Sequence, residues 1–267
     1  MLQYAEKWTQ AVTAWDAVLC ASPEASAADT EVKAERSWCL FHAGELEVAH
    51  EAMKDVVEVL EARKIVRDEE KKAKEKARSK AGIERGEGVE EGETTPEALE
   101  RATAWWRLGQ CLWELGGALF AQLGLNHLLT FTAHRPETDP DQNAPAYDAF
   151  ISAVLATPTY APAFTSLGVY YQTVEPIDFA RSSQCFSKAF ELDDGQEVAA
   201  RFLAEEFSEL GDWSLVEVVA RRVVDGNGGK SALGGKAAQR LSWAWKAIGG
   251  AELVRRPSLL WSQKPIN

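Results

Sequence analysis

Several features that identify enzymes and metal proteins are scarce in this sequence. Only four cysteines occur among 267 residues, and Cys20, Cys39, Cys111 and Cys185 form no Cys-x-x-Cys pair. We expect them to be small core residues of a protein in a reducing compartment. The four histidines lack metal-ligand spacing, and the dispersed Ser, His and Asp residues indicate no catalytic grouping. The sequence therefore predicts no enzyme activity, no catalytic or cofactor-binding residue, no cofactor and no metal ligand.

Long apolar runs and excess positive charge are missing as well. No apolar run reaches the roughly 18 residues of a membrane span, and the N-terminus lacks the basic and apolar segments of a secretory signal. There are 29 Lys and Arg against 41 Asp and Glu, which gives a formal charge of −12. Because an acidic chain repels phosphate backbones, no direct nucleic-acid site is evident. We expect a cytoplasmic location, with the nucleus as an open alternative, and no membrane partner.

What the sequence does contain is a helical repeat, clearest between Ala146 and Tyr171. In a tetratricopeptide (TPR) unit of 34 residues, the first helix (helix A) carries large residues at repeat positions 4, 7 and 11 and a small one at 8. The second helix (helix B) carries small residues at positions 20 and 27 and a large one at 24, and Pro follows at position 32. With Pro158 at position 32, these positions are filled by Ala146, Phe150, Ala153, Phe164, Leu167, Gly168 and Tyr171.

Other segments fit the same register. Helix A positions 4, 7 and 8 are filled by Trp105, Leu108 and Gly109, and helix B positions 24 and 27 by Phe186 and Ala189. Runs of Val, Ile and Thr bounded by turns are scarce, so strands are not expected. The sequence predicts an all-α TPR superhelix of helical hairpins, with an internal charged linker and one hairpin insertion.

The repeats divide the chain into four predicted segments. They are 1–63, N-terminal TPR units with the first one partial; 64–96, a charged helix and a disordered acidic linker; 97–254, a TPR array with an insertion at about 117–143; and 255–267, a non-repeat tail. The charged helix interleaves acidic and basic residues without aromatics, which favours a solvated helix over an RNA-contacting one. Because the array has no polar capping helix, we expect a truncated chain.

Function in such a solenoid is expected on the concave face, at helix A positions 2, 5, 9, 12 and 13. The candidate partner-binding residues at these positions are Trp106, Gln110, Trp113, Arg201 and Glu205. The two tryptophans are either anchors for a partner peptide or residues buried by the neighbouring insertion. Position 5 lacks the Lys, and position 9 the Asn, of TPR domains that bind chaperone tails, so a chaperone co-factor is disfavoured.

Five strings go beyond generic repeat positions: WWRLGQCLWELGG, YAPAFTSLGVYY, CFSKAFELD, GDWSLVEVVARRVV and SWAWKAIG. In this order, and over roughly Val32 to Leu253, the chain resembles the TPR scaffold subunit of the fungal superkiller complex. The resemblance implies a non-catalytic scaffold that joins a DExH RNA helicase subunit and WD40 subunits and assists the exosome in 3′-to-5′ mRNA decay in the cytoplasm. Two alternatives stay open: a generic TPR peptide-binding adaptor of another assembly, and the TPR part of a larger enzyme.

Overall fold

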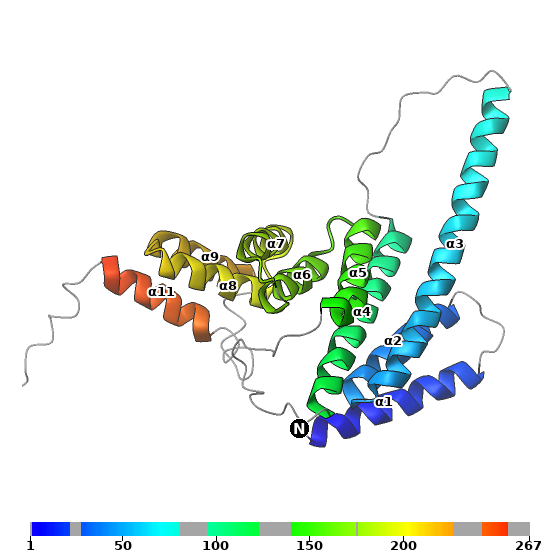
Figure 1. Cartoon of the computed structure of the whole chain (residues 1–267), viewed down its shortest axis with the longest axis horizontal. Helices are drawn as coiled ribbons and strands as arrows, with labels where there is room; N and C mark the ends of the chain where they lie inside the picture. Colours follow the sequence, from blue (N-terminus) through cyan, green and yellow to red (C-terminus); the bar gives the residue numbers. More distant parts are fainter. Residues whose placement is uncertain are drawn as a thin grey trace, which may run out of the picture. The chain divides into compact units, whose positions relative to one another are not determined.

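Helices account for all regular secondary structure in the part of the chain that the structure describes (Figure 1). The computed structural model describes residues 2–21, 28–80, 95–122, 140–174, 176–226 and 242–255. The predicted acidic linker, most of the predicted hairpin insertion and nearly all of the predicted tail lie outside these ranges. Consecutive helices pack against each other as hairpins, which confirms the predicted all-α fold of TPR type.

The chain divides after Thr159 into two compact units. The helices of the first unit are α1 (Leu2–Ala21), α2 (Ala28–Ala43), α3 (Leu46–Lys80), α4 (Pro96–Gln122) and α5 (Pro140–Ala156). Each packs on the next in the sequence, α1 on α2, α2 on α3, α3 on α4 and α4 on α5. The turn between α2 and α3 contains Gly44 with a φ of 91°, a conformation that glycine adopts without strain.

α3 is a single helix of 35 residues and crosses the predicted boundary at residue 63 (Figure 1). Its first half carries Met53, Val56 and Leu60, which are buried against α4. In its second half, Arg67 pairs with Glu97 of α4 at 2.8 Å, and the following turns are mostly exposed. Such turns are supported by local pairs such as Lys74 with Glu70, four residues apart.

The start of α4 is explained by a capping hydrogen bond. The Oγ1 of Thr95 accepts a hydrogen bond from the amide of Ala98 at 3.2 Å, so Thr95 caps the helix before Pro96. α4 continues to Gln122, into the insertion predicted at about 117–143. The added segment, GALFAQ, contains good helix formers that offset its single glycine.

The second unit contains α6 (Ala161–Thr173), α7 (Phe179–Leu192), α8 (Glu197–Glu209), α9 (Trp213–Gly226) and α11 (Ser242–Arg255). Its core is made by one face of each of α7, α8 and α9, with Phe186, Leu203 and Val223 almost inaccessible to solvent. Removing a large apolar side chain of this kind from water contributes about 1.5–3 kcal/mol. The Asp178 side chain caps α7 by accepting a hydrogen bond from the amide of Arg181 at 2.9 Å.

Two glycines allow the helices of a hairpin to approach closely. A Cβ on Gly109 would lie 2.5 Å from Cε1 of Phe150, and a Cβ on Gly168 would lie 2.7 Å from Cε1 of Phe186. Both glycines occupy repeat position 8, and both phenylalanines occupy position 24. The small residue predicted at position 8 is therefore explained by the ring it faces.

Candidate partner-binding surface

Aromatic side chains of the first unit meet on helices α1, α2 and α4. We call Trp8, Trp38, Phe41, His42 and Trp106 the aromatic cluster. The Trp38 ring lies 5.4 Å from that of Trp106, and the Trp8 ring stacks on His42 at 4.6 Å with an interplanar angle of 22°. Trp38 and Phe41 stack at 4.8 Å. Aromatic pairs at these separations stabilise each other and hold their rings in defined orientations.

The members of the aromatic cluster differ in their exposure to solvent. Trp8, Trp38, Phe41 and Trp106 are half-buried, whereas His42 is exposed. Half-buried tryptophans are the residue type that most often supplies binding energy at interfaces. The aromatic cluster can therefore contact an apolar or aromatic partner side chain without rearrangement of its own backbone.

Arg107 of α4 fixes the position of Trp38. Its guanidinium carbon lies 5.2 Å from the centre of the Trp38 ring, and its Nη2 pairs with Glu35 of α2 at 2.8 Å. A guanidinium over an indole ring is attracted by the negative face of that ring. Partial burial lowers the pKa of His42, and the nearby Arg107 charge lowers it further. The lowered pKa favours the neutral form of the His42 ring that stacks on Trp8.

The structure places the five predicted binding residues on two different units. Trp106, Gln110 and Trp113 are half-buried on α4, whereas Arg201 and Glu205 are exposed on α8. Trp106 contacts Trp38 of α2, an arrangement that neither predicted alternative included. The function of these five residues stays a prediction.

Sequence reasoning missed Trp8, Trp38 and His42 as members of the site. Trp38 and His42 occupy repeat positions 9 and 13 of the α2–α3 hairpin, which are concave positions. This hairpin departs from the usual repeat pattern, because Arg36 and Ser37 stand where Leu and Gly are usual. The same positional rule, applied to this hairpin, would have found both residues.

The predicted packing residues fall into two groups. Those that lie buried are Leu108, Gly109, Ala146, Phe150, Ala153, Leu167, Gly168, Phe186 and Ala189. Those that keep partial or full exposure are Trp105, Pro158, Phe164 and Tyr171. Trp105 donates its indole N–H to Glu61 at 2.9 Å, and Pro158 lies in the turn after α5.

Metal-binding groups and membrane-spanning helices are both absent from the described residues. No group of three or more His, Cys, Asp or Glu side chains within them is placed to hold a metal ion. Among the described helices, none is both long and apolar enough to cross a membrane. Burial raises the pKa of the Cys111 thiol to about 12, as for a core residue.

Comparison with known proteins identifies relatives of part of the chain. Over 108 residues, 40% of this chain, it is 43% identical to Superkiller protein 3 of Schizosaccharomyces pombe. Over 124 residues, 45% of this chain, it is 27% identical to Superkiller protein 3 of Saccharomyces cerevisiae. The matched part of the chain is therefore similar to Superkiller protein 3. No protein-family model matches the sequence.

The extent of this relationship is limited on both sides. The matched stretches span 7% and 8% of the two Superkiller protein 3 chains, so the similarity concerns a small part of those proteins. They are also shorter than the span from Val32 to Leu253 over which the resemblance was expected. The predicted resemblance to the superkiller family is confirmed for the matched part.

Proposed function

We propose that this chain is part of a non-catalytic TPR scaffold of a superkiller-type complex. The observation that carries the proposal is the 43% identity to Superkiller protein 3 in a chain whose described part consists of helical hairpins. Such repeats present side chains on stacked helices and act through their surfaces. On this proposal the partners are a DExH RNA helicase subunit, WD40 subunits and the exosome. The process is cytoplasmic 3′-to-5′ mRNA decay.

Within this scaffold, we assign a partner contact to the aromatic cluster. Trp38 and Trp106 are half-buried, held by Arg107 and each other, and so lose little side-chain freedom on binding. Truncation of a tryptophan at the centre of an interface commonly costs about 2 kcal/mol or more, roughly thirtyfold in affinity. The cluster is therefore the place where substitution tests the proposal most directly.

The test is co-purification of the intact protein that contains this chain, from its own organism. We expect a DExH helicase and a WD40 protein to be recovered, and the association to survive nuclease treatment. The double variant Trp38→Ala/Trp106→Ala should recover less of at least one of them. Trp245→Ala is the matched control, because Trp245 is an exposed tryptophan of α11 outside the cluster.

Two outcomes would contradict the proposal. Recovery of a chaperone without a helicase would favour a TPR adaptor of another assembly. If the Trp245→Ala protein lost its partners to the same extent, the aromatic cluster would not be a specific partner contact.

A further inference from the structure

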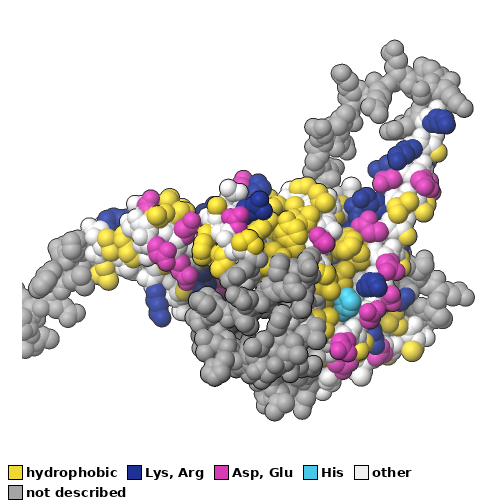
Figure 2. Space-filling model, in the orientation of Figure 1, with side chains coloured by type: hydrophobic (Ala, Val, Ile, Leu, Met, Phe, Trp, Pro, Cys, Tyr) yellow, Lys and Arg dark blue, Asp and Glu magenta, His cyan; other side chains and the backbone are white. Residues whose placement is uncertain are grey.

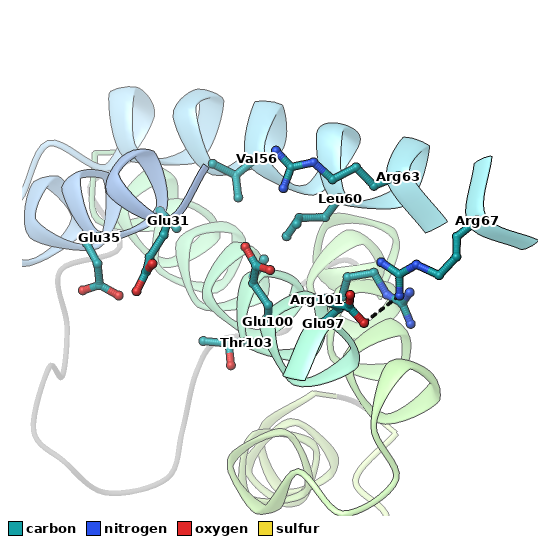
Figure 3. Close-up of a pocket in the computed structure, with 12 residues that line it drawn as sticks. Glu31, Glu35, Val56, Leu60, Arg63, Arg67, Glu97, Glu100, Arg101 and Thr103 are labelled. Atoms are coloured by element: carbon teal, nitrogen blue, oxygen red, sulfur yellow. Dashed lines mark hydrogen bonds and ion pairs between the residues drawn. The ribbon is translucent and has the colours of Figure 1, made fainter. Parts of the chain in front are cut away.

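A groove in the first unit lies between α2, α3 and α4 (Figure 3). Its volume is about 690 Å³, within the range of roughly 300–1,000 Å³ typical of sites that bind small ligands or a few side chains. Val56, Leu60 and Ala104 form an apolar floor and are each at least nine-tenths buried. We call this cavity the α2–α3–α4 groove.

Most of the cations around the groove are already engaged by the protein itself. Arg67 pairs with Glu97 at 2.8 Å at one end, as the dashed line in Figure 3 shows. Arg63 donates from Nη2 to Oγ1 of Thr30 at 2.6 Å. An anionic ligand would have to compete with these internal partners.

Two carboxylates of the groove, in contrast to these arginines, have no internal partner among the described residues. Glu31 of α2 and Glu100 of α4 both line the groove, and within the described residues neither makes an ion pair or a side-chain hydrogen bond. Carboxylates beside an apolar floor, in a chain of formal charge −12, attract a cationic side chain. The charge of the free groups therefore selects a basic occupant.

A third group of the groove needs a hydrogen-bond acceptor. The Nε of Arg101 is buried and makes no hydrogen bond, and its nearest carboxylate oxygen, on Glu61, is 3.9 Å away. A buried donor without an acceptor costs free energy, which a backbone carbonyl of a bound peptide would recover. A peptide offers all three complements at once: a cation, an apolar side chain and a carbonyl.

We propose that the α2–α3–α4 groove docks an extended segment of a partner protein that carries Lys or Arg beside an aliphatic residue. The aliphatic side chain lies on Val56, Leu60 and Ala104, the cation lies against Glu31 and Glu100, and a backbone carbonyl accepts from Arg101. The proposal rests on the scaffold function only in that the occupant is a protein. Peptide binding can fail while helicase and WD40 proteins still co-purify, and co-purification can fail while the peptide still binds. Each test can therefore contradict its own proposal without deciding the other.

The test measures fluorescence anisotropy of labelled octapeptides with the 267-residue chain. The probe is Gly-Ser-Arg-Leu-Ser-Arg-Gly-Ser, compared with a peptide that has Glu for both Arg and with one that has Ser for Leu. We expect the first peptide to bind best, the Ser peptide to bind more weakly and the Glu peptide not to bind. Binding should weaken at about 0.5 M NaCl, where exposed charges are screened.

Variants of the chain locate the binding. Glu31→Gln/Glu100→Gln should weaken binding of the basic peptide about five- to tenfold, as expected for two partly exposed ion pairs. Glu47→Gln/Glu58→Gln makes the same charge change on exposed α3 residues outside the groove and should leave binding unchanged. Thr103→Trp should block the groove, with circular dichroism reporting whether the helices persist.

Three results would overturn the proposal. Preferential binding of the Glu peptide would make the groove an anion site for Arg63 and Arg101. If both double variants weakened binding equally, the peptide would be attracted by the overall negative charge of the chain and not by the groove. Absence of binding by all three peptides to the folded chain would leave the groove without a basic peptide partner.

Discussion

At the residue scale, the hairpins obey one rule of complementary size at repeat positions 8 and 24. The pairs at these positions are Gly109 with Phe150, Gly168 with Phe186, Ser37 with Met53, and Ala204 with Ala220. Glycine occurs where position 24 is a phenylalanine ring, and a larger residue occurs where position 24 is an unbranched or small side chain. Close packing of protein interiors requires this kind of matching.

In two hairpins, a serine hydroxyl makes a hydrogen bond between repeat positions 8 and 20. Ser37 at position 8 donates from Oγ to the carbonyl of Ala49 at position 20, at 2.7 Å. Ser182 at position 20 donates in the opposite direction, to the carbonyl of Gly168 at position 8, at 2.9 Å. Both serines are fully buried, so each hydroxyl needs this partner. The α2–α3 hairpin is thus a variant of the repeat rather than a poor copy of it.

The first prediction concerns Gly168. The Gly168→Ala substitution places a methyl group against the Phe186 ring, and overpacking of this kind costs about 1–3 kcal/mol. The free energy of unfolding, measured by urea titration, should fall accordingly. Gly249→Ala is the matched control, because a Cβ there meets nothing within 4 Å and alanine favours a helix by about 0.5–1 kcal/mol.

A second substitution tests the cause of the Gly168 effect. In the Gly168→Ala/Phe186→Leu protein, the two changes should cost less than the sum of their separate costs, because a smaller side chain leaves room for the methyl group. Strict additivity of the two costs would show that the Phe186 ring is not what requires glycine.

At the element scale, a buried carboxylate joins α11 to α9. Glu217 of α9 is 8% exposed and accepts hydrogen bonds from Arg221 of its own helix, at 2.6 Å, and from Arg255 of α11. The Arg221 hydrogen bond is the main cause that lowers the pKa of Glu217 below its ordinary 4.5, and Arg255 lowers it further against the opposing effect of burial. Glu252, on α11, lies near Arg255 and Arg221.

The second prediction is a pH dependence of this connection. Because the folded pKa lies below the unfolded one, the stability that Glu217 contributes is present above about pH 4.5 and is lost as the pH falls through the lowered pKa. Glu217→Gln should therefore lower the urea midpoint at pH 7, and the difference from the parent protein should shrink near pH 4. Glu205→Gln, an exposed carboxylate of the same unit, should change neither midpoint.

A constant difference between the parent and Glu217→Gln proteins at both pH values would contradict this account. It would mean that the effect of the substitution comes from the shape of the side chain and not from its charge.

The sequence predicts elements better than it predicts the site. Repeat spacing predicts helices where α5 and α6 lie, because this signal is local, although α5 begins at Pro140, inside the insertion predicted at about 117–143. The helical extension of α4 to Gln122 is not predicted, since composition alone does not show where a helix of good formers ends. The contact of Trp38 with Trp106 joins residues 68 positions apart through the packing of separate helices, and no single-helix pattern contains it.

At the scale of the whole molecule, the excess of negative charge is spread along the chain. On the face of α3 that Figure 2 shows, Lys and Arg side chains are interspersed with Asp and Glu. The exposed turns of α3 after Arg67 contain Lys71, Lys72, Lys74 and Lys76, with Glu70 beside Lys74. The acidic residues of α3 and the formal charge of −12 weaken the attraction to a phosphate backbone.

The last prediction follows from this distribution. The 267-residue chain should give no change in the anisotropy of a labelled single-stranded RNA at about 0.15 M salt, because its formal charge is −12 and the face of α3 in Figure 2 mixes acidic with basic side chains. Replacement of Lys71, Lys72, Lys74 and Lys76 by Ala should leave both the RNA measurement and the recovery of helicase and WD40 proteins unchanged. RNA binding that falls steeply with salt and disappears in this variant would identify the second half of α3 as a nucleic-acid contact. The scaffold would then hold RNA directly, and the solvated reading of this helix would be wrong.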